Sequence, residues 1–87
     1  MPTRDPARRS RLLVPDLGPL EAPLTVSLWL LPPGTRVAAG DRVVELVAGG
    51  VTIDLQSPVS GRLVAQLVDE DEPITPGMVV AEFEADP

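Results

Sequence analysis

The chain has 87 residues and a formal net charge of −6 at pH 7; 44% of its residues are hydrophobic, but Trp29 and Phe83 are its only aromatic side chains. It contains no cysteine and no histidine, and all seven of its cations are arginine, so lysine is absent as well. This composition excludes disulfides, thiolate chemistry and the commonest general base, and the acidic balance argues against nucleic acid as a partner.

The first ten residues, MPTRDPARRS, hold two prolines and several charges without apolar periodicity. We interpret residues 1–10 as a disordered arm that precedes a single domain over residues 11–85. A short targeting segment and a tag for an anionic partner are the alternatives. No apolar run approaches the roughly 18 residues that a membrane span needs, and we therefore expect a soluble, cytoplasmic protein.

From residue 11 onward, short apolar stretches alternate with turns rich in proline and glycine, which is typical of many short β-strands. Valine dominates these stretches, and β-branched residues favour strands. No window shows a helical period over ten or more residues, so the pattern predicts an all-β fold. The predicted strands are Arg11–Val14, Leu24–Leu31, Arg42–Ala48, Val51–Leu55, Arg62–Val68 and Met78–Glu84.

An internal repeat organises these strands. A shift of 37 residues places Gly40 on Gly77 and the isolated Val37 on the equally isolated Ile74. Each half then contains a strand, a loop, one isolated apolar residue, a tight glycine turn and a second strand. Two such halves related by a pseudo-twofold axis would pack two small sheets face to face.

The segment 45–61, ELVAGGVTIDLQSPVSG, resembles the lipoyl domain of 2-oxo-acid dehydrogenase acyltransferases. In that family a Glu-x-x-x-Asp-Lys-Ala hairpin is followed by an alternating strand and a Ser-Pro-Val-Ser-Gly bend, which residues 57–61 reproduce. Segments 15–18, 29–37 and 79–84 look like three further parts of the family pattern, so the resemblance spans about residues 11–84. It implies a flattened β-barrel or sandwich of two four-stranded antiparallel sheets, the barrel-sandwich hybrid, with a modified lysine at one hairpin tip.

The chain departs from the family at that tip. The lysine of the family lies eleven residues before the last glycine of the bend, and in this chain that position is Gly50, flanked by Gly49 and Val51. Lipoate or biotin is attached through an amide to a side-chain amine, which glycine does not have, so we expect no covalent cofactor. The glycine pair suits a type I′ hairpin turn, in which both central residues have positive φ, and we expect the hairpin to persist as structure.

The densest charge cluster is the run Asp69-Glu70-Asp71-Glu72. We interpret it as a solvated loop or, alternatively, as a surface that docks a basic partner. Four consecutive acids without the glycine of a calcium loop do not predict a metal site. Trp29 is expected to be mostly buried with its indole N–H bonded; an exposed Trp29 would instead be a candidate interface anchor.

Catalysis finds little support among the polar residues. Glu45 and Glu82 occupy equivalent repeat positions, but two outward-facing glutamates on separate strands are commoner than an acid–base pair. Ser27, Ser57 and Ser60 lack the histidine that a hydrolytic triad requires. We therefore expect no enzymatic activity.

The sequence thus indicates a lipoyl-like domain that acts as a protein-interaction or structural module. Its partner would be a protein, such as a dehydrogenase or carboxylase component. The alternatives are a separately encoded accessory subunit or fragment of a 2-oxo-acid dehydrogenase or biotin-dependent carboxylase complex, and the lipoyl-like domain of a membrane-fusion or efflux adaptor. The candidate contact residues are Gly49, Gly50, Val51, Trp29, Asp69, Glu70, Asp71 and Glu72.

Overall fold

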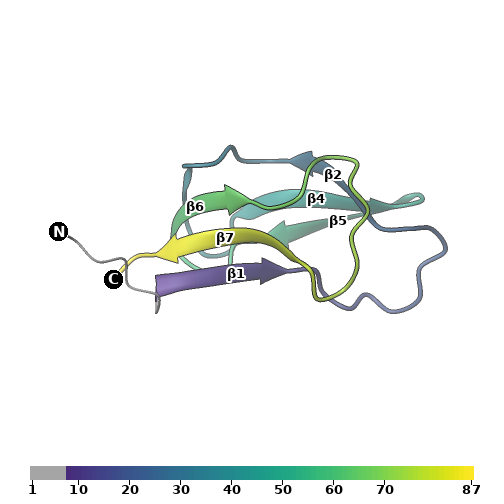
Figure 1. The fold of residues 1–87 in the computed structure, drawn as a ribbon, viewed down its shortest axis with the longest axis horizontal. Helices are drawn as coiled ribbons and strands as arrows, with labels where there is room; N and C mark the ends of the chain where they lie inside the picture. Colours follow the sequence, from purple (N-terminus) through teal and green to yellow (C-terminus); the bar gives the residue numbers. More distant parts are fainter. Residues whose placement is uncertain (1–7) are drawn as a thin grey trace.

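The computed structural model describes residues 8–87, which form an all-β fold, as the alternating sequence pattern predicted (Figure 1). The prediction of a disordered arm concerns residues 1–10, most of which lie outside the described residues. Arg9 and Ser10 belong to the first strand, where they pair with Glu84 and Phe83. The strands are β1 (Arg9–Leu13), β2 (Thr25–Trp29), β3 (Arg36–Val37), β4 (Arg42–Ala48), β5 (Val51–Gln56), β6 (Gly61–Gln66) and β7 (Val79–Ala85).

The strands form two antiparallel sheets, one with the order β1-β7-β6-β3 and the other with the order β2-β4-β5. A single hydrophobic core lies between them and takes residues from both. Val26 and Leu46 of the second sheet and Leu63 and Phe83 of the first are fully buried in it. Because nearly all of these core residues are aliphatic, the sheets are held by close packing of small branched side chains.

The second sheet has three strands instead of the four that the resemblance implied. Residues 73–74, which correspond to residues 36–37 after the shift of 37, form no strand but an isolated bridge between Thr25 and Pro73. Hydrogen bonds flank this bridge from the Ile74 N–H to the Leu24 carbonyl at 2.9 Å and from the Val26 N–H to the Glu72 carbonyl at 3.1 Å. The equivalent strand of the first sheet, β3, is itself only two residues long.

The internal repeat is visible in the backbone. A shift of 37 residues carries β4, residues 42–48, onto β7, residues 79–85. The irregularity in the β2–β4 register between Val26 and Leu28 recurs in the β6–β7 register between Leu63 and Ala65, which are the same positions after the shift. The two halves therefore share strand positions and irregularities, as a pseudo-twofold relation requires.

The bend at residues 57–61 joins the two sheets, and the structure gives a role to its two serines and its glycine. The Ser60 hydroxyl accepts a hydrogen bond from the Ala39 N–H at 2.9 Å, and the Ser57 hydroxyl donates to the Val59 carbonyl at 2.6 Å. A Cβ atom on Gly61 would overlap the backbone carbonyl of Glu84 on β7. Only glycine lets β6 approach β7 this closely at position 61.

Candidate functional site

The tip of the β4–β5 hairpin is the position at which the sequence resemblance places the missing lysine. Ala48 and Val51 form the last strand pair, and Gly49 and Gly50 make the turn. Gly49 has a φ of 60°, whereas Gly50 is not in the left-handed region. Positive φ at the first central residue alone is the pattern of a type II′ turn, so the expected type I′ turn is wrong. Gly50 therefore has a backbone conformation open to any residue.

Space at the tip also differs between the two glycines. A Cβ atom on Gly50 would meet no other atom within 4 Å, while one on Gly49 would lie 3.5 Å from the Cβ of Ala22. The side chain of Val51 is 55% exposed beside them. The tip consequently has room for a side chain to start from position 50, although the chain supplies none.

Two loops frame this end of the molecule, and an apolar groove lies between them. Loop 15–24 reaches the tip through Ala22, and loop 69–75 is tied to β2 by the Thr25–Pro73 bridge. An Asx turn shapes the first loop, because the Asp16 carboxylate accepts a hydrogen bond from the Gly18 N–H at 2.9 Å. The groove is lined mainly by proline and branched aliphatic side chains: Pro15, Leu17, Leu20, Pro23, Ile74 and Pro76.

These two loops carry the whole net charge of the chain. They contain six carboxylates and no cation, whereas the remainder of the sequence contains seven arginines and seven carboxylates. The net charge of −6 is therefore concentrated in these two loops, one of which reaches the hairpin tip while the acidic run lies along β2. The six carboxylates belong to Asp16, Glu21, Asp69, Glu70, Asp71 and Glu72.

The acidic run is a structured loop. Glu70 accepts a hydrogen bond from the Trp29 backbone N–H at 3.0 Å, and Glu72 accepts one from the Asp69 N–H at 3.0 Å. Asp71 has a φ of 68°, and its N–H donates to the Val26 carbonyl at 2.7 Å. Two of the acids thus fix backbone N–H groups of β2 and of the loop, a role that the sequence pattern did not reveal.

Trp29 lies at the end of β2, half-buried, and its indole Nε1–H donates to the Val68 carbonyl at 3.0 Å. Gln66 occupies the equivalent position in the other half and donates its Nε2–H to the Leu31 carbonyl at 2.8 Å. The acceptors are also equivalent, since a shift of 37 residues carries Leu31 onto Val68. Applying the repeat to Trp29 would have found this reciprocal pair, which sequence reasoning missed.

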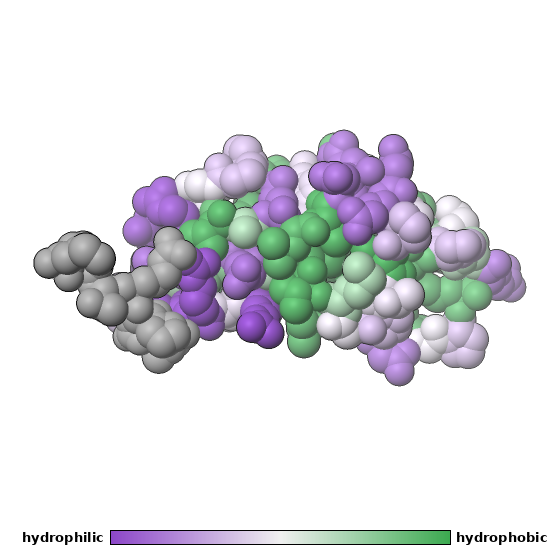
Figure 2. Space-filling model, in the orientation of Figure 1, coloured by the Kyte–Doolittle hydropathy of each residue, from purple (hydrophilic) through white to green (hydrophobic). Residues whose placement is uncertain are grey.

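An exposed apolar band is a further feature that the sequence did not predict. Leu13 and Leu67 are 49% and 48% exposed. Leu13 pairs with Val79, and the Leu67 N–H bonds to the carbonyl of Val80, so these residues adjoin β7. Figure 2 shows hydrophobic side chains gathered across the middle of this face, with hydrophilic residues on both sides.

The remaining polar candidates do not form a reaction centre. Glu45 lies in β4 and Glu82 in β7, which belong to different sheets. Within residues 8–87, no group of three or more potential metal-ligating side chains converges. The same part of the chain contains no helix with the length and apolar character needed to traverse a bilayer. What the arrangement offers chemically is non-covalent binding at the loops, at Trp29 and along the exposed apolar band.

The fold and the hairpin define a lipoyl/biotinyl type of domain, and comparison with known proteins agrees. The model of the family described as "Biotin-requiring enzyme" matches residues 10–83. The chain therefore belongs to the lipoyl/biotinyl carrier domain family.

Two relatives belong to acyltransferase components. The chain is 32% identical over 68 residues to the dihydrolipoyllysine-residue acetyltransferase component of the pyruvate dehydrogenase complex of Corynebacterium glutamicum, covering 78% of this chain. It is 30% identical over 76 residues to the dihydrolipoyllysine-residue succinyltransferase component of the 2-oxoglutarate dehydrogenase complex of Bartonella vinsonii subsp. berkhoffii, covering 87% of this chain. The matched regions make up only 10% and 18% of the length of those relatives.

A solved structure shows the same fold. A single-chain, multi-domain long-chain acyl-CoA carboxylase matches 92% of this chain with a TM-score of 0.74 and 22% identity. The match covers 7% of the carboxylase chain, so the resemblance is to one small part of a large protein.

Proposed function

We propose that this chain is a lipoyl/biotinyl-type domain that carries no covalent cofactor and acts through non-covalent protein contacts. The observation that carries the proposal is Gly50, which stands where the resemblance places the acceptor lysine. Both cofactors are attached to a side-chain amine, and none of the 87 residues is lysine. An interaction or structural role needs only the fold and the surface, which the domain retains without the amine.

The local structure is consistent with a hairpin that has lost the site of cofactor attachment but kept its backbone fold. The β4–β5 ladder runs to the last pair, Ala48 and Val51, and the turn at Gly49 and Gly50 projects from it. Open space surrounds position 50, and its backbone is unstrained for other residues. Replacing the amine-bearing residue by glycine would therefore leave the hairpin in place.

The surface around the tip supports a protein partner. An apolar groove lies between loops that hold six carboxylates and no cation. Apolar area supplies affinity, and a concentrated field of one sign steers a partner of the opposite sign. The partner that fits is a basic component of a 2-oxo-acid dehydrogenase or biotin-dependent carboxylase complex, because two relatives are dehydrogenase-complex components and a protein of similar fold is a carboxylase. In such a complex this chain would be a docking or accessory subunit.

Intact mass spectrometry tests the absence of attachment. The chain is co-expressed with a lipoyl ligase and lipoate and, separately, with a biotin ligase and biotin, and its mass is measured. We expect the unmodified mass in both experiments, because no side-chain amine is present. A lipoyl or biotinyl adduct on the native sequence would overturn the proposal.

Restoring the amine is the matched positive control. Gly50→Lys should give a folded protein, since a Cβ atom at position 50 has open space around it and the φ of this residue is not in the left-handed region. We expect this variant, or Gly49→Asp combined with Gly50→Lys, to gain a lipoyl adduct. The single variant is the milder change, because Gly49 has a φ of 60° that favours glycine. If both variants fold but stay unmodified, the missing amine is not the main difference from a carrier domain.

A further inference from the structure

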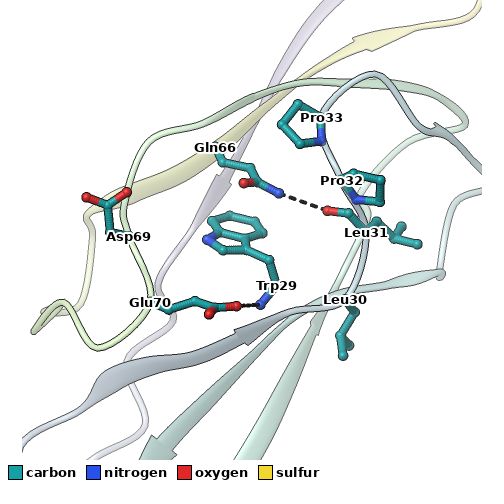
Figure 3. A pocket seen from close by; sticks show the side chains of 8 residues that line it. All are labelled: Trp29, Leu30, Leu31, Pro32, Pro33, Gln66, Asp69 and Glu70. Carbon is teal, nitrogen blue, oxygen red and sulfur yellow. Dashed lines mark hydrogen bonds between the residues drawn. The ribbon is translucent and has the colours of Figure 1, made fainter.

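A second concave site lies away from the hairpin tip. A hollow of about 670 Å³ opens between the end of β2, the proline segment that follows it and the acidic loop (Figure 3). None of the residues that line it is cationic. Its walls include the indole of Trp29, two prolines and two carboxylates, supplied by Trp29, Leu31, Pro32, Pro33, Asp69 and Glu70.

The aromatic wall of this hollow is held in position. Trp29 packs against the core on one side, and its Nε1–H is fixed to the Val68 carbonyl at 3.0 Å. Glu70 is anchored next to it, because its Oε2 atom accepts a hydrogen bond from the Trp29 backbone N–H at 3.0 Å. Figure 3 shows the indole standing between Gln66 and Glu70, with Asp69 at the same rim. A pre-ordered ring beside a pre-ordered carboxylate needs little reorganisation to bind a ligand.

We propose that this hollow binds the guanidinium group of an arginine side chain, presented by a basic segment of a partner protein. A guanidinium is planar, stacks on the face of a tryptophan and forks its N–H groups to carboxylates. The indole of Trp29 provides the face, and Asp69 and Glu70 provide the carboxylates. The Asp69 carboxylate accepts no hydrogen bond and forms no ion pair within residues 8–87, which leaves it available for this ligand.

The neighbouring surface extends the fit to a peptide segment. Leu28 and Leu30 are 47% and 36% exposed at the end of β2. Beyond Leu30 a second hollow is lined by Asp41, Glu45, Asp54 and a single cation, Arg42. Leucine side chains between two acidic hollows match a segment in which apolar and basic residues alternate.

Trp29 reports on this binding directly, because it is the only tryptophan in the chain. The full chain is titrated with the peptide acetyl-Arg-Leu-Arg-amide, with a matched peptide in which neutral citrulline replaces both arginines as control. We expect a saturable change in tryptophan emission with the arginine peptide only, weakening as ionic strength rises. The absence of a saturable change, or an equal response to the citrulline peptide, would overturn the proposal.

A pair of variants separates the site from the general acidity of the loop. Asp69→Asn removes a carboxylate that lines the hollow, and Asp71→Asn removes one from the same loop that does not. Asparagine tolerates the positive φ of Asp71, so both variants should keep the native circular dichroism. We expect Asp69→Asn to raise the dissociation constant about threefold to fivefold and Asp71→Asn to leave it nearly unchanged.

An equal loss in both variants would show that peptide binding depends only on the diffuse negative field, and the site would be refuted. This inference does not depend on the state of the hairpin tip. A cofactor adduct at the tip would overturn the proposed function without affecting the titration, and a failed titration would not alter the mass experiment.

Discussion

The two halves of the molecule, residues 24–48 and 61–85, have the same backbone conformation but different surface side chains. Gly34 and Asp71 occupy equivalent positions, and both have positive φ, 89° and 68°. Their N–H groups donate to the carbonyls of Leu63 and Val26, again equivalent residues, at 2.7 Å in both cases. Hydrogen bonds between main-chain groups therefore maintain the symmetry with little help from side-chain identity.

The side chains differ where the backbones agree. The loop Pro32–Thr35 in one half is uncharged, while its counterpart Asp69–Glu72 carries four carboxylates. A buried leucine, Leu24, corresponds to Gly61, and Trp29 corresponds to Gln66. A backbone held by its own hydrogen bonds leaves surface positions open to change. In this chain that change has placed acidic and aromatic groups together on one side.

The largest difference between the halves should appear at Gly61. Gly61→Ala would place a methyl group against the Glu84 carbonyl, so we expect the free energy of unfolding to fall by about 3 kcal/mol or more. Urea denaturation followed by circular dichroism measures the change. Gly50→Ala is the control and should alter stability by less than about 0.5 kcal/mol, because its Cβ meets nothing. Similar losses in both variants would contradict the close approach of β6 and β7.

The reciprocal hydrogen bonds of Trp29 and Gln66 should contribute unequally. Trp29→Phe removes the indole donor and leaves the carbonyl of buried Val68 without its partner, so we expect a loss of about 2 kcal/mol. Gln66→Met removes the other donor, but Leu31 is only half-buried and its carbonyl can turn to water, so we expect about 1 kcal/mol. Thermal and urea unfolding of both variants would test the order. A larger loss for Gln66→Met would show that the burial of the acceptor does not set the cost.

Exchange of the left-handed residues should have the smallest effect and opposite signs in the two halves. Asp71→Gly should stabilise the protein by about 0.5 kcal/mol, because glycine adopts positive φ without steric cost. Gly34→Asp should destabilise it by about 1 kcal/mol for the same reason. The two variants are compared by their urea midpoints at matched salt concentration. Stability changes of the same sign would contradict a governing role of backbone strain in these loops.

The sequence predicted much of this architecture because the repeat and the glycine turns are local signals. The shift of 37 residues located β4 and β7, and the Gly49–Gly50 turn marked the hairpin. Two details depended on tertiary context. The fourth strand of the second sheet is reduced to the isolated bridge between Thr25 and Pro73, and the choice between type I′ and type II′ turns is open when both central residues are glycine.

The candidate site was less accessible from sequence. Asp16 and Glu21 are about fifty residues from the acidic run, and only the chain topology brings their two loops together around one groove. The hydrogen bond from the Trp29 N–H to Glu70 links side chain and backbone across 41 positions, with no periodic pattern to announce it. Such sites arise from the meeting of loops, whose residues obey no strand alternation.

The placement of the strand ends determines where a linker or tag can be attached without blocking the hairpin. β1 begins at Arg9 opposite Glu84, and Gly61 pairs with Ala85 near the end of β7. In Figure 1 this junction lies at the pole of the molecule opposite the β4–β5 turn. A linker or immobilising tag fused after Pro87 would therefore extend away from the turn. The hairpin and its flanking loops would then face the solution, at the end of the domain opposite the point of attachment.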